Sequence, residues 1–129
     1  YLRTRKQFGK PIGSFQSLQH RAVDLAVQQE LSAAVVAQAI AEIDAGGTAQ
    51  QRARRAARVK ARCSDAALTI AREAVQLHGA IGVTDEYDLG LYLQRALVLS
   101  AWLGNAGTQR RRYAALGRDA HRSSTKGQS

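Results

Sequence analysis

The sequence predicts an all-α protein, an antiparallel four-helix bundle with two long helices. Residues 15–45 and 49–78 both repeat apolar side chains at helical spacing, and glycine follows each segment. The composition agrees, because one proline and 45% hydrophobic residues in 129 suit long helices around a core. Helices of about 30 residues would extend about 45 Å, which suits an elongated bundle.

At the N-terminus, residues 1–6 are interpreted as the end of a helix, as though the chain were cut from a longer one. Residues 7–13 are predicted to form a loop, since glycine and proline interrupt them. Ser14 is the expected N-cap of the helix at 15–45.

The helix at 49–78 gives the strongest periodic signal in the chain. Gly46 and Gly47 separate it from the preceding helix, and Thr48 is the expected N-cap. Its small apolar residues indicate a close approach between helices. The predicted core stripe comprises Ala56, Val59, Cys63, Ala66, Ile70, Ala74 and Leu77.

The C-terminal third is predicted to hold two shorter helices. Residues 80–88 form a connector, a helix follows at 89–103, and glycines at 104–107 interrupt it. A last helix is expected near 108–116, and residues 119–129 are predicted to be a polar, disordered tail.

The chain is strongly basic, with 19 Lys and Arg against 10 Asp and Glu, a net charge of +9. Such a charge favours anionic partners: nucleic acid, phosphates or an acidic neighbouring subunit. Six of the basic residues lie between Arg52 and Arg62. A nucleic-acid surface is one interpretation of this run. We favour the other, a solvated helix face, because Arg55, Arg58 and Arg62 each precede a residue of the apolar stripe by one position. The run also lacks the interleaved aromatic residues of a single-strand binder.

Several classes of site have no support in the sequence. The single Cys63 excludes a cysteine-rich metal site, and the three histidines lack metal-ligand spacing, so no metal is predicted. We find neither a glycine-rich phosphate loop nor a nucleophilic triad. No stretch has the length of uninterrupted apolar residues that a membrane span needs, and the expected compartment is the cytoplasm. His78 is interpreted as a helix C-cap.

Two stretches are specific enough to compare with known families. Residues 5–16 read R-K-Q-F-G-K-P-I-G-S-F-Q, and residues 74–87 read A-V-Q-L-H-G-A-I-G-V-T-D-E-Y. They resemble the C-terminal helical domain of acyl-CoA dehydrogenases, whose patterns are R-x-Q-F-G-x-x-I-x-x-F-Q and Q-x-H-G-G-x-G-x-T-x-E. The order and separation match. The resemblance covers residues 1–118, which we interpret as one domain.

The resemblance implies a flavin-dependent activity. The family removes a proton from Cα of an acyl-CoA thioester and passes hydride from Cβ to FAD. A complete subunit also has a helical N-terminal domain and a middle β-domain. The resemblance therefore implies that this chain is a domain or fragment, inactive alone, with acyl-CoA as the substrate of the complete enzyme. It also implies a homo- or hetero-oligomer, dimeric or tetrameric, and no membrane partner.

The resemblance implies that this domain contacts FAD held by a neighbouring subunit. Arg5 matches the arginine that reaches the pyrophosphate, and guanidinium pairs with phosphate oxygens through two parallel hydrogen bonds. Alternatively, the apolar residues among the cofactor-contacting positions given next are only part of the loop and helix core. The cofactor-contacting positions implied are Arg5, Gln7, Phe8, Ile12, Phe15, Gln16, Gln76 and Gly79.

The sequence departs from the family pattern where many members carry the catalytic glutamate. Leu103 occupies that position, and no Asp or Glu occurs from residue 89 to 118. Ala80, Asn105 and Gly107 also replace family residues. We therefore assign no catalytic residue. Either the base lies on an earlier helix upstream of Tyr1, or this is a non-catalytic subunit of a heteromeric enzyme.

Residues 85–96, D-E-Y-D-L-G-L-Y-L-Q-R-A, favour the heteromeric explanation. They resemble the E-H-D-x-H-L-Y-L-R-R-A stretch of actinobacterial members, some of which act on steroid-derived acyl-CoAs in mixed-subunit complexes. Fatty-acid or steroid side-chain degradation is the implied role. A structural subunit without flavin and a basic nucleic-acid-binding module stay as alternatives, the second disfavoured.

Overall fold

The structure is a computed structural model that describes residues 1–79 and 88–126, with side chains described up to Arg118. Its described part has four α-helices: α1 (Gln16–Asp44), α2 (Ala49–His78), α3 (Leu89–Ala101) and α4 (Ala106–Lys126). The predicted all-α class and the two long helices are confirmed. The bounds of α1 and α2 agree with the prediction within one residue, because strong breakers flank both.

The N-terminal segment is not the end of a helix, and that prediction was wrong. Residues 1–5 form a turn, in which the Tyr1 carbonyl accepts hydrogen bonds from the Thr4 and Arg5 amides, both at 2.9 Å. The strands β1 (Lys6–Gln7) and β2 (Lys10–Pro11) then pair antiparallel. The Arg5 carbonyl accepts from the Ile12 amide at 2.8 Å, so this backbone group serves the hairpin rather than a helix.

A short 3-10 helix, η1 (Ile12–Ser14), connects the hairpin to α1. Ser14 is not the N-cap of α1 as predicted, because Phe15 holds that position without a side-chain cap. The Ser14 hydroxyl instead donates to the Pro11 carbonyl at 2.7 Å. Gly13 is required here, since a Cβ would lie only 2.8 Å from the Leu2 carbonyl oxygen.

The predicted cap of α2 is confirmed. Thr48 Oγ1 accepts from the Gln51 amide at 3.2 Å, and Gln51 Oε1 accepts from the Thr48 amide at 2.9 Å. This reciprocal pair satisfies two backbone donors that a helix start leaves open. Gly46 and Gly47 precede it with φ of +97° and +123°, the left-handed region that favours glycine.

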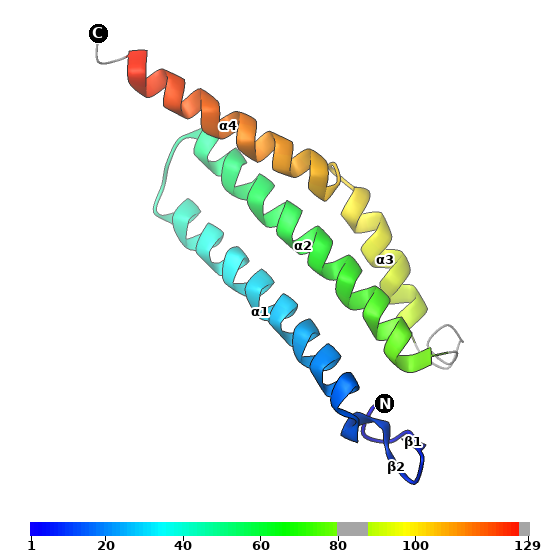
Figure 1. The fold of residues 1–129 in the computed structure, drawn as a ribbon. Helices are drawn as coiled ribbons and strands as arrows, with labels where there is room; N and C mark the ends of the chain where they lie inside the picture. The colour runs from blue at the N-terminus through cyan, green and yellow to red at the C-terminus, as the bar shows by residue number, and fades with distance from the viewer. Residues whose placement is uncertain (80–87, 127–129) are drawn as a thin grey trace.

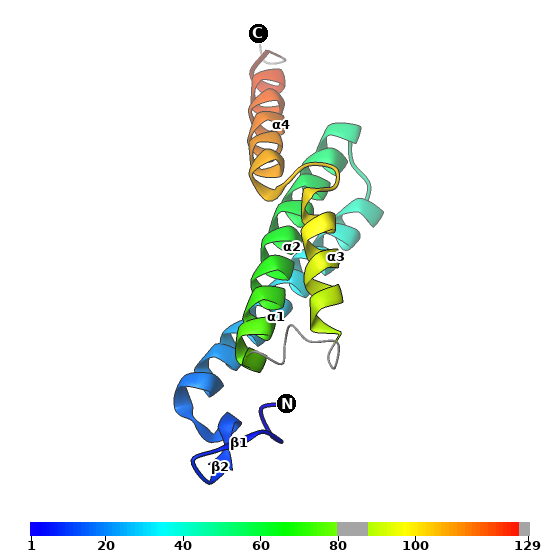
Figure 2. The same cartoon turned by 90° about the vertical axis from the view of Figure 1, so that its right-hand side faces the viewer.

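The centre of the fold is α2, which contacts α1, α3 and α4 (Figure 1). The helix α1 runs antiparallel along one side of α2. On the other side, α3 follows the C-terminal half of α2 and α4 follows its N-terminal half, and the view in Figure 2 agrees. The helices therefore flank α2 rather than enclose one common core.

The buried core consists mainly of small residues. Ala57 is 1% exposed, and Ala61, Ser64 and Ala66 on α2 are also buried. Small side chains let the neighbouring helices approach closely. The predicted stripe was partly wrong, because Ala56 is exposed and most of its other members are half-buried. A helix packed on two sides needs more than the single stripe that apolar periodicity reveals.

The C-terminal helices differ from the prediction at their ends. The helix α3 ends at Ala101 rather than near Leu103. Asn105 Oδ1 accepts from the Thr108 amide at 2.9 Å, which caps α4 and starts it at Ala106. The helix continues to Lys126, past the end predicted near residue 116, because residues 118–126 contain no glycine or proline.

Large apolar side chains remain on the surface of two helices. Val23, Val27 and Leu31 form an exposed row on α1, and Leu91, Tyr92 and Val98 are exposed on α3. Rows of this kind are typical of surfaces that another domain or subunit covers. Within the described ranges, no helix combines the length and apolarity needed to cross a membrane.

Candidate cofactor pocket

A pocket of about 370 Å³ lies where the N-terminal hairpin meets the C-terminal end of α2. It contains seven of the eight positions that the resemblance implies for cofactor contact, although they lie more than 60 residues apart in sequence. Gln16, the eighth, is exposed at the first turn of α1 and does not line the pocket. The lining comprises Tyr1, Arg5, Gln7, Phe8, Ile12, Phe15, Ser17, Leu18, Gln76, Leu77, His78 and Gly79.

The hairpin places an aromatic side chain at its tip. Phe8 and Gly9 form the two-residue turn, with φ of +51° and +78°, as tight hairpins require. A phenylalanine is costly in this conformation, and the Phe8 residue is also 90% exposed. Its ring meets Phe15 edge-on at 6.3 Å between centroids, and Lys10 Nζ lies 4.5 Å from the Phe15 ring centre. Such a strained, exposed aromatic residue is typical of a surface that contacts a ligand or another protein chain.

Arg5 supplies the positive charge of the pocket. Its side chain is exposed, and within the described residues it has no hydrogen bond or ion pair. Its guanidinium therefore keeps five donors available for an anion. Amide groups of Gln7 and Gln76 line the same pocket, so a cation and neutral donors converge there.

The end of α2 forms the other wall. His78 Nδ1 lies 2.7 Å from the Ala74 carbonyl, so the imidazole binds the last turn as predicted for a C-cap. Its ring also stacks on Tyr1, with 4.4 Å between centroids and 27° between planes. Gly79 follows with φ +61° and ψ −146°, a conformation essentially limited to glycine. The stack joins the two segments that form the pocket.

Sequence reasoning gave Tyr1 no role and did not pair it with His78. The only available signal was that an aromatic residue precedes one motif and a histidine ends the other. Contacts between residues so distant in sequence depend on how the helices pack, which no local pattern reveals.

Leu103, at the position of the expected glutamate, is not part of this pocket. It lies between α3 and α4 with φ +59° and is 68% exposed. Its carbonyl accepts from Gln109 Nε2 at 2.5 Å, and Gln109 is buried. The leucine side chain cannot accept a proton. Ala80, another departure from the family pattern, lies outside the described residues.

The arginine run on α2 is not the solvated face that we predicted. Arg55 Nε pairs with Glu42 Oε2 at 3.0 Å, and Arg58 Nη2 pairs with the same oxygen at 3.3 Å. Arg62 Nη2 donates to the Gln28 carbonyl at 3.2 Å. These half-buried side chains hold α1 against α2. Arg55, Arg58 and Arg62 therefore make contacts within the fold and do not form a fully solvated basic face.

Two other predictions concern metals and the thiol. In the described part of the chain, no group of three or more His, Cys, Asp or Glu side chains is placed to hold a metal ion. Cys63 is half-buried, and this burial raises its pKa, although Arg62 and Lys60 oppose the shift. The thiol is therefore less reactive than a free one, as expected for a core position.

Comparison with known proteins shows the family to which the chain belongs. Residues 1–116 match the family model described as "Acyl-CoA dehydrogenase, C-terminal domain". The chain is 42% identical over 115 residues to acyl-CoA dehydrogenase IpdE2 of Mycolicibacterium smegmatis, covering 89% of this chain and 34% of that protein. It is 41% identical over 119 residues to FadE34 of Mycobacterium tuberculosis, covering 90% and 16%.

Solved structures share the fold. A variant of the Tcur3481-Tcur3483 steroid acyl-CoA dehydrogenase superposes with a TM-score of 0.86 at 29% identity, over 94% of this chain and 33% of that one. Butyryl-CoA dehydrogenase from Megasphaera elsdenii superposes with a TM-score of 0.81 at 29% identity, over 89% of this chain and 29% of that one. The chain thus spans about a third or less of the proteins it matches. It belongs to the acyl-CoA dehydrogenase family and corresponds to the family's C-terminal helical domain.

Proposed function

We propose that this chain supplies the C-terminal helical domain of an FAD-dependent acyl-CoA dehydrogenase, which introduces an α,β double bond into an acyl-CoA thioester. The single observation that carries the proposal is the pocket at the hairpin. It gathers Arg5, Gln7, Phe8, Gln76 and Gly79 from two distant segments. The proposed compartment is the cytoplasm.

The residues of the pocket suit the chemistry of FAD. The uncompensated Arg5 guanidinium matches a pyrophosphate, because a planar fork of donors binds phosphate oxygens in pairs. The Phe8 and Phe15 rings offer apolar surface to a planar heterocycle, and the Gln7 and Gln76 amides offer hydrogen bonds to its polar edges. When bound, FAD would accept the hydride that leaves Cβ of the substrate.

In this proposal, the chain's own residues bind and orient the cofactor. Arg5 would hold the pyrophosphate, and Gly79 would let the backbone approach without a Cβ in the way. The Tyr1–His78 stack would keep the hairpin against α2, which fixes the distance between Arg5 and Gln76. The exposed Phe8 supports contact with a neighbouring subunit, since its surface is otherwise in water.

A second candidate, a non-catalytic subunit of a heteromeric acyl-CoA dehydrogenase, is favoured by Leu103 and by the absence of any acid from residue 89 to 118. One solved structure similar to this chain is named for two components, Tcur3481 and Tcur3483, of a steroid enzyme. In this arrangement a partner subunit would carry the base. A steroid-derived acyl-CoA is the substrate class that this similarity suggests.

The proposal is tested by replacing Arg5 in the native assembly that contains this chain. We expect Arg5→Ala to lower the flavin retained after dialysis by roughly tenfold or more, because a charge-assisted pair contributes about 1.5–3 kcal/mol. Arg3→Ala is the matched control: Arg3 is also exposed and near in sequence but does not line the pocket. Equal flavin content in the two variants would contradict the proposed role of Arg5.

A further inference from the structure

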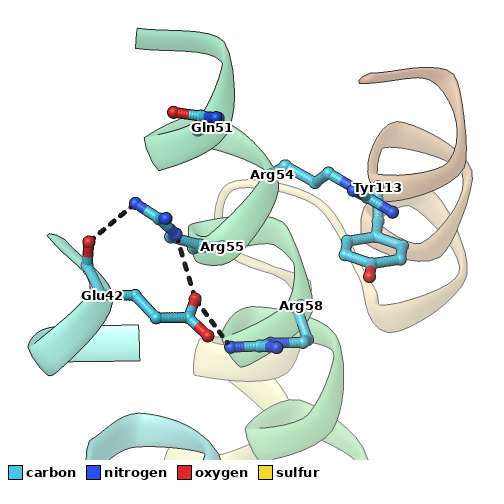
Figure 3. Close-up of a pocket in the computed structure, with 6 residues that line it drawn as sticks. All are labelled: Glu42, Gln51, Arg54, Arg55, Arg58 and Tyr113. Carbon is cyan, nitrogen blue, oxygen red and sulfur yellow. Dashed lines mark hydrogen bonds and ion pairs between the residues drawn. The ribbon is translucent and has the colours of Figure 1, made fainter. Parts of the chain in front are cut away.

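Residues of α1, α2 and α4 line a second pocket (Figure 3). In Figure 1 the ends of α1 and α2 that carry these residues lie opposite the hairpin. Along α2, Arg55 in the second pocket and Leu77 in the first are about 33 Å apart at 1.5 Å per residue. The second pocket has a volume of about 380 Å³. Its lining comprises Glu42, Gln51, Arg54, Arg55, Arg58 and Tyr113.

The charges in this pocket do not balance. Three guanidinium groups and one carboxylate line the pocket, which gives a formal net charge of +2, and in Figure 3 only Arg55 and Arg58 pair with Glu42. Arg55 is the best compensated of the three cations. It pairs with the Glu42 carboxylate and also donates from Nη1 to the Glu42 and Gly46 carbonyls at 2.8 and 3.1 Å. Arg58 shares the same carboxylate oxygen at the longer distance of 3.3 Å.

Arg54 has no compensating acid among the described side chains, which end at Arg118. Within the described residues it makes no ion pair and no hydrogen bond, and its guanidinium carbon lies 4.3 Å from the Tyr113 ring centre. Gly117 leaves room for it, because a Cβ there would lie 3.1 Å from Arg54 Nη2. The Nε atoms of Arg54 and Arg58 are both buried without a hydrogen-bond partner. These two cations are thus partly desolvated without full compensation.

The excess positive charge of Arg54 and Arg58 lies on neighbouring positions of one helix, where it can attract an anion. Residues four apart on a helix are neighbours, about 5–6 Å between Cβ atoms, and two like charges there repel each other. An anion between them replaces this repulsion by two attractions. We propose that Arg54 and Arg58 form a binding site for a compact, doubly charged oxyanion of the phosphate class.

The chemistry favours phosphate over a carboxylate from another chain. A carboxylate has two oxygens and one negative charge, which would neutralise only one of the two guanidinium groups. A phosphate group has more oxygens and a charge near −2 at neutral pH, which matches two forks and a pocket of +2. In Figure 3 the Arg54 guanidinium lies against Tyr113 and the Arg58 guanidinium points toward Glu42, so the two cations border the same pocket from different directions.

The test measures inorganic phosphate binding by isothermal titration calorimetry on the native assembly at constant ionic strength. All variants carry Arg5→Gln, which removes the arginine of the hairpin pocket from the measurement. We expect saturable binding that Arg54→Gln weakens by about tenfold. The matched control is Arg72→Gln, on the same helix, exposed and outside the pocket, and it should leave the affinity unchanged.

A gain-of-binding variant separates this result from misfolding. Glu42→Gln keeps the size of the side chain and a carbonyl oxygen that can still accept from Arg55 and Arg58, but removes the competing negative charge, so it should tighten phosphate binding several-fold. Equal affinities of Arg54→Gln and Arg72→Gln would overturn the proposal, as would weaker binding in Glu42→Gln. Binding of malonate without binding of phosphate would show that the site takes carboxylates, which would overturn the assignment to the phosphate class.

Discussion

The two ends of this molecule use arginine in opposite ways. At the hairpin, Arg5 is exposed and uncompensated in the described part of the chain, and it lies in the same pocket as the exposed Phe8. At the other end, Arg55 and Arg58 are 23% and 30% exposed at their side chains and hold α1 to α2 through Glu42. The first arrangement leaves the arginine side chain without a hydrogen bond or ion pair to the described residues, whereas Arg55 and Arg58 at the second end also stabilise the contact between two helices. Substitutions at the two ends should therefore affect different properties.

The largest effect on stability is expected where α2 meets its neighbours near the second end. Ala57→Leu adds three carbons at a position that is 1% exposed, and overpacking of this kind costs about 1–3 kcal/mol or more. We expect the free energy of unfolding, measured by urea denaturation, to fall by about 3 kcal/mol. Ala56→Leu is the control, because Ala56 is exposed and the change should stay within about 0.5 kcal/mol. Equal losses in both variants would contradict the burial pattern of α2.

The ion-pair network predicts the next largest effect. Glu42→Ala would leave Arg55 and Arg58 half-buried without their carboxylate, and we expect a loss of about 1–3 kcal/mol, below the cost at a fully buried pair. Glu30→Ala on the same helix removes an exposed acid without an ion pair in the described structure, so it should change stability by less than about 0.5 kcal/mol. If the two variants unfold at the same urea concentration, the network does not stabilise the α1–α2 contact.

A substitution at the hairpin tip should do the reverse, with little effect on stability and a clear effect on the proposed function. Phe8→Asn places a residue that tolerates positive φ at an exposed turn. The free energy of unfolding should therefore change by no more than about 0.5 kcal/mol. Flavin retention in the native assembly should nevertheless fall, because the apolar surface is lost. A variant that keeps all of its flavin would remove Phe8 from the proposed contact.

The smallest effect concerns Cys63. Burial raises its pKa, so the thiolate forms only at a pH above the range of an exposed thiol. We expect the rate of alkylation by iodoacetamide to rise at a higher pH in the folded protein than in the urea-unfolded chain. Coinciding pH profiles would show that Cys63 is effectively exposed.

The long helices and the family were predictable from sequence because their signals are local. Glycines and Thr48 mark the ends of α1 and α2, and two contiguous motifs carry nine of the residues that line the first pocket, seven of which the resemblance had implied. The N-terminal turn was not predictable in this way, since it depends on the Leu2 carbonyl accepting from the Gly13 amide at 2.8 Å. The positive charge of the arginine run was evident from the sequence, but its ion-pair partner was not. Glu42 lies on another helix and comes close to these arginines only when the chain folds.

The visible absorbance spectrum of the purified native assembly, with its subunits identified by intact mass, tests the central claim most directly. We expect flavin absorbance, and a second subunit carrying the catalytic glutamate if the enzyme is heteromeric. Flavin together with a single longer polypeptide would instead direct the search for the base to a segment preceding Tyr1. A colourless assembly that gains no colour when FAD is added would contradict the proposal that this domain serves a flavin-dependent acyl-CoA dehydrogenase.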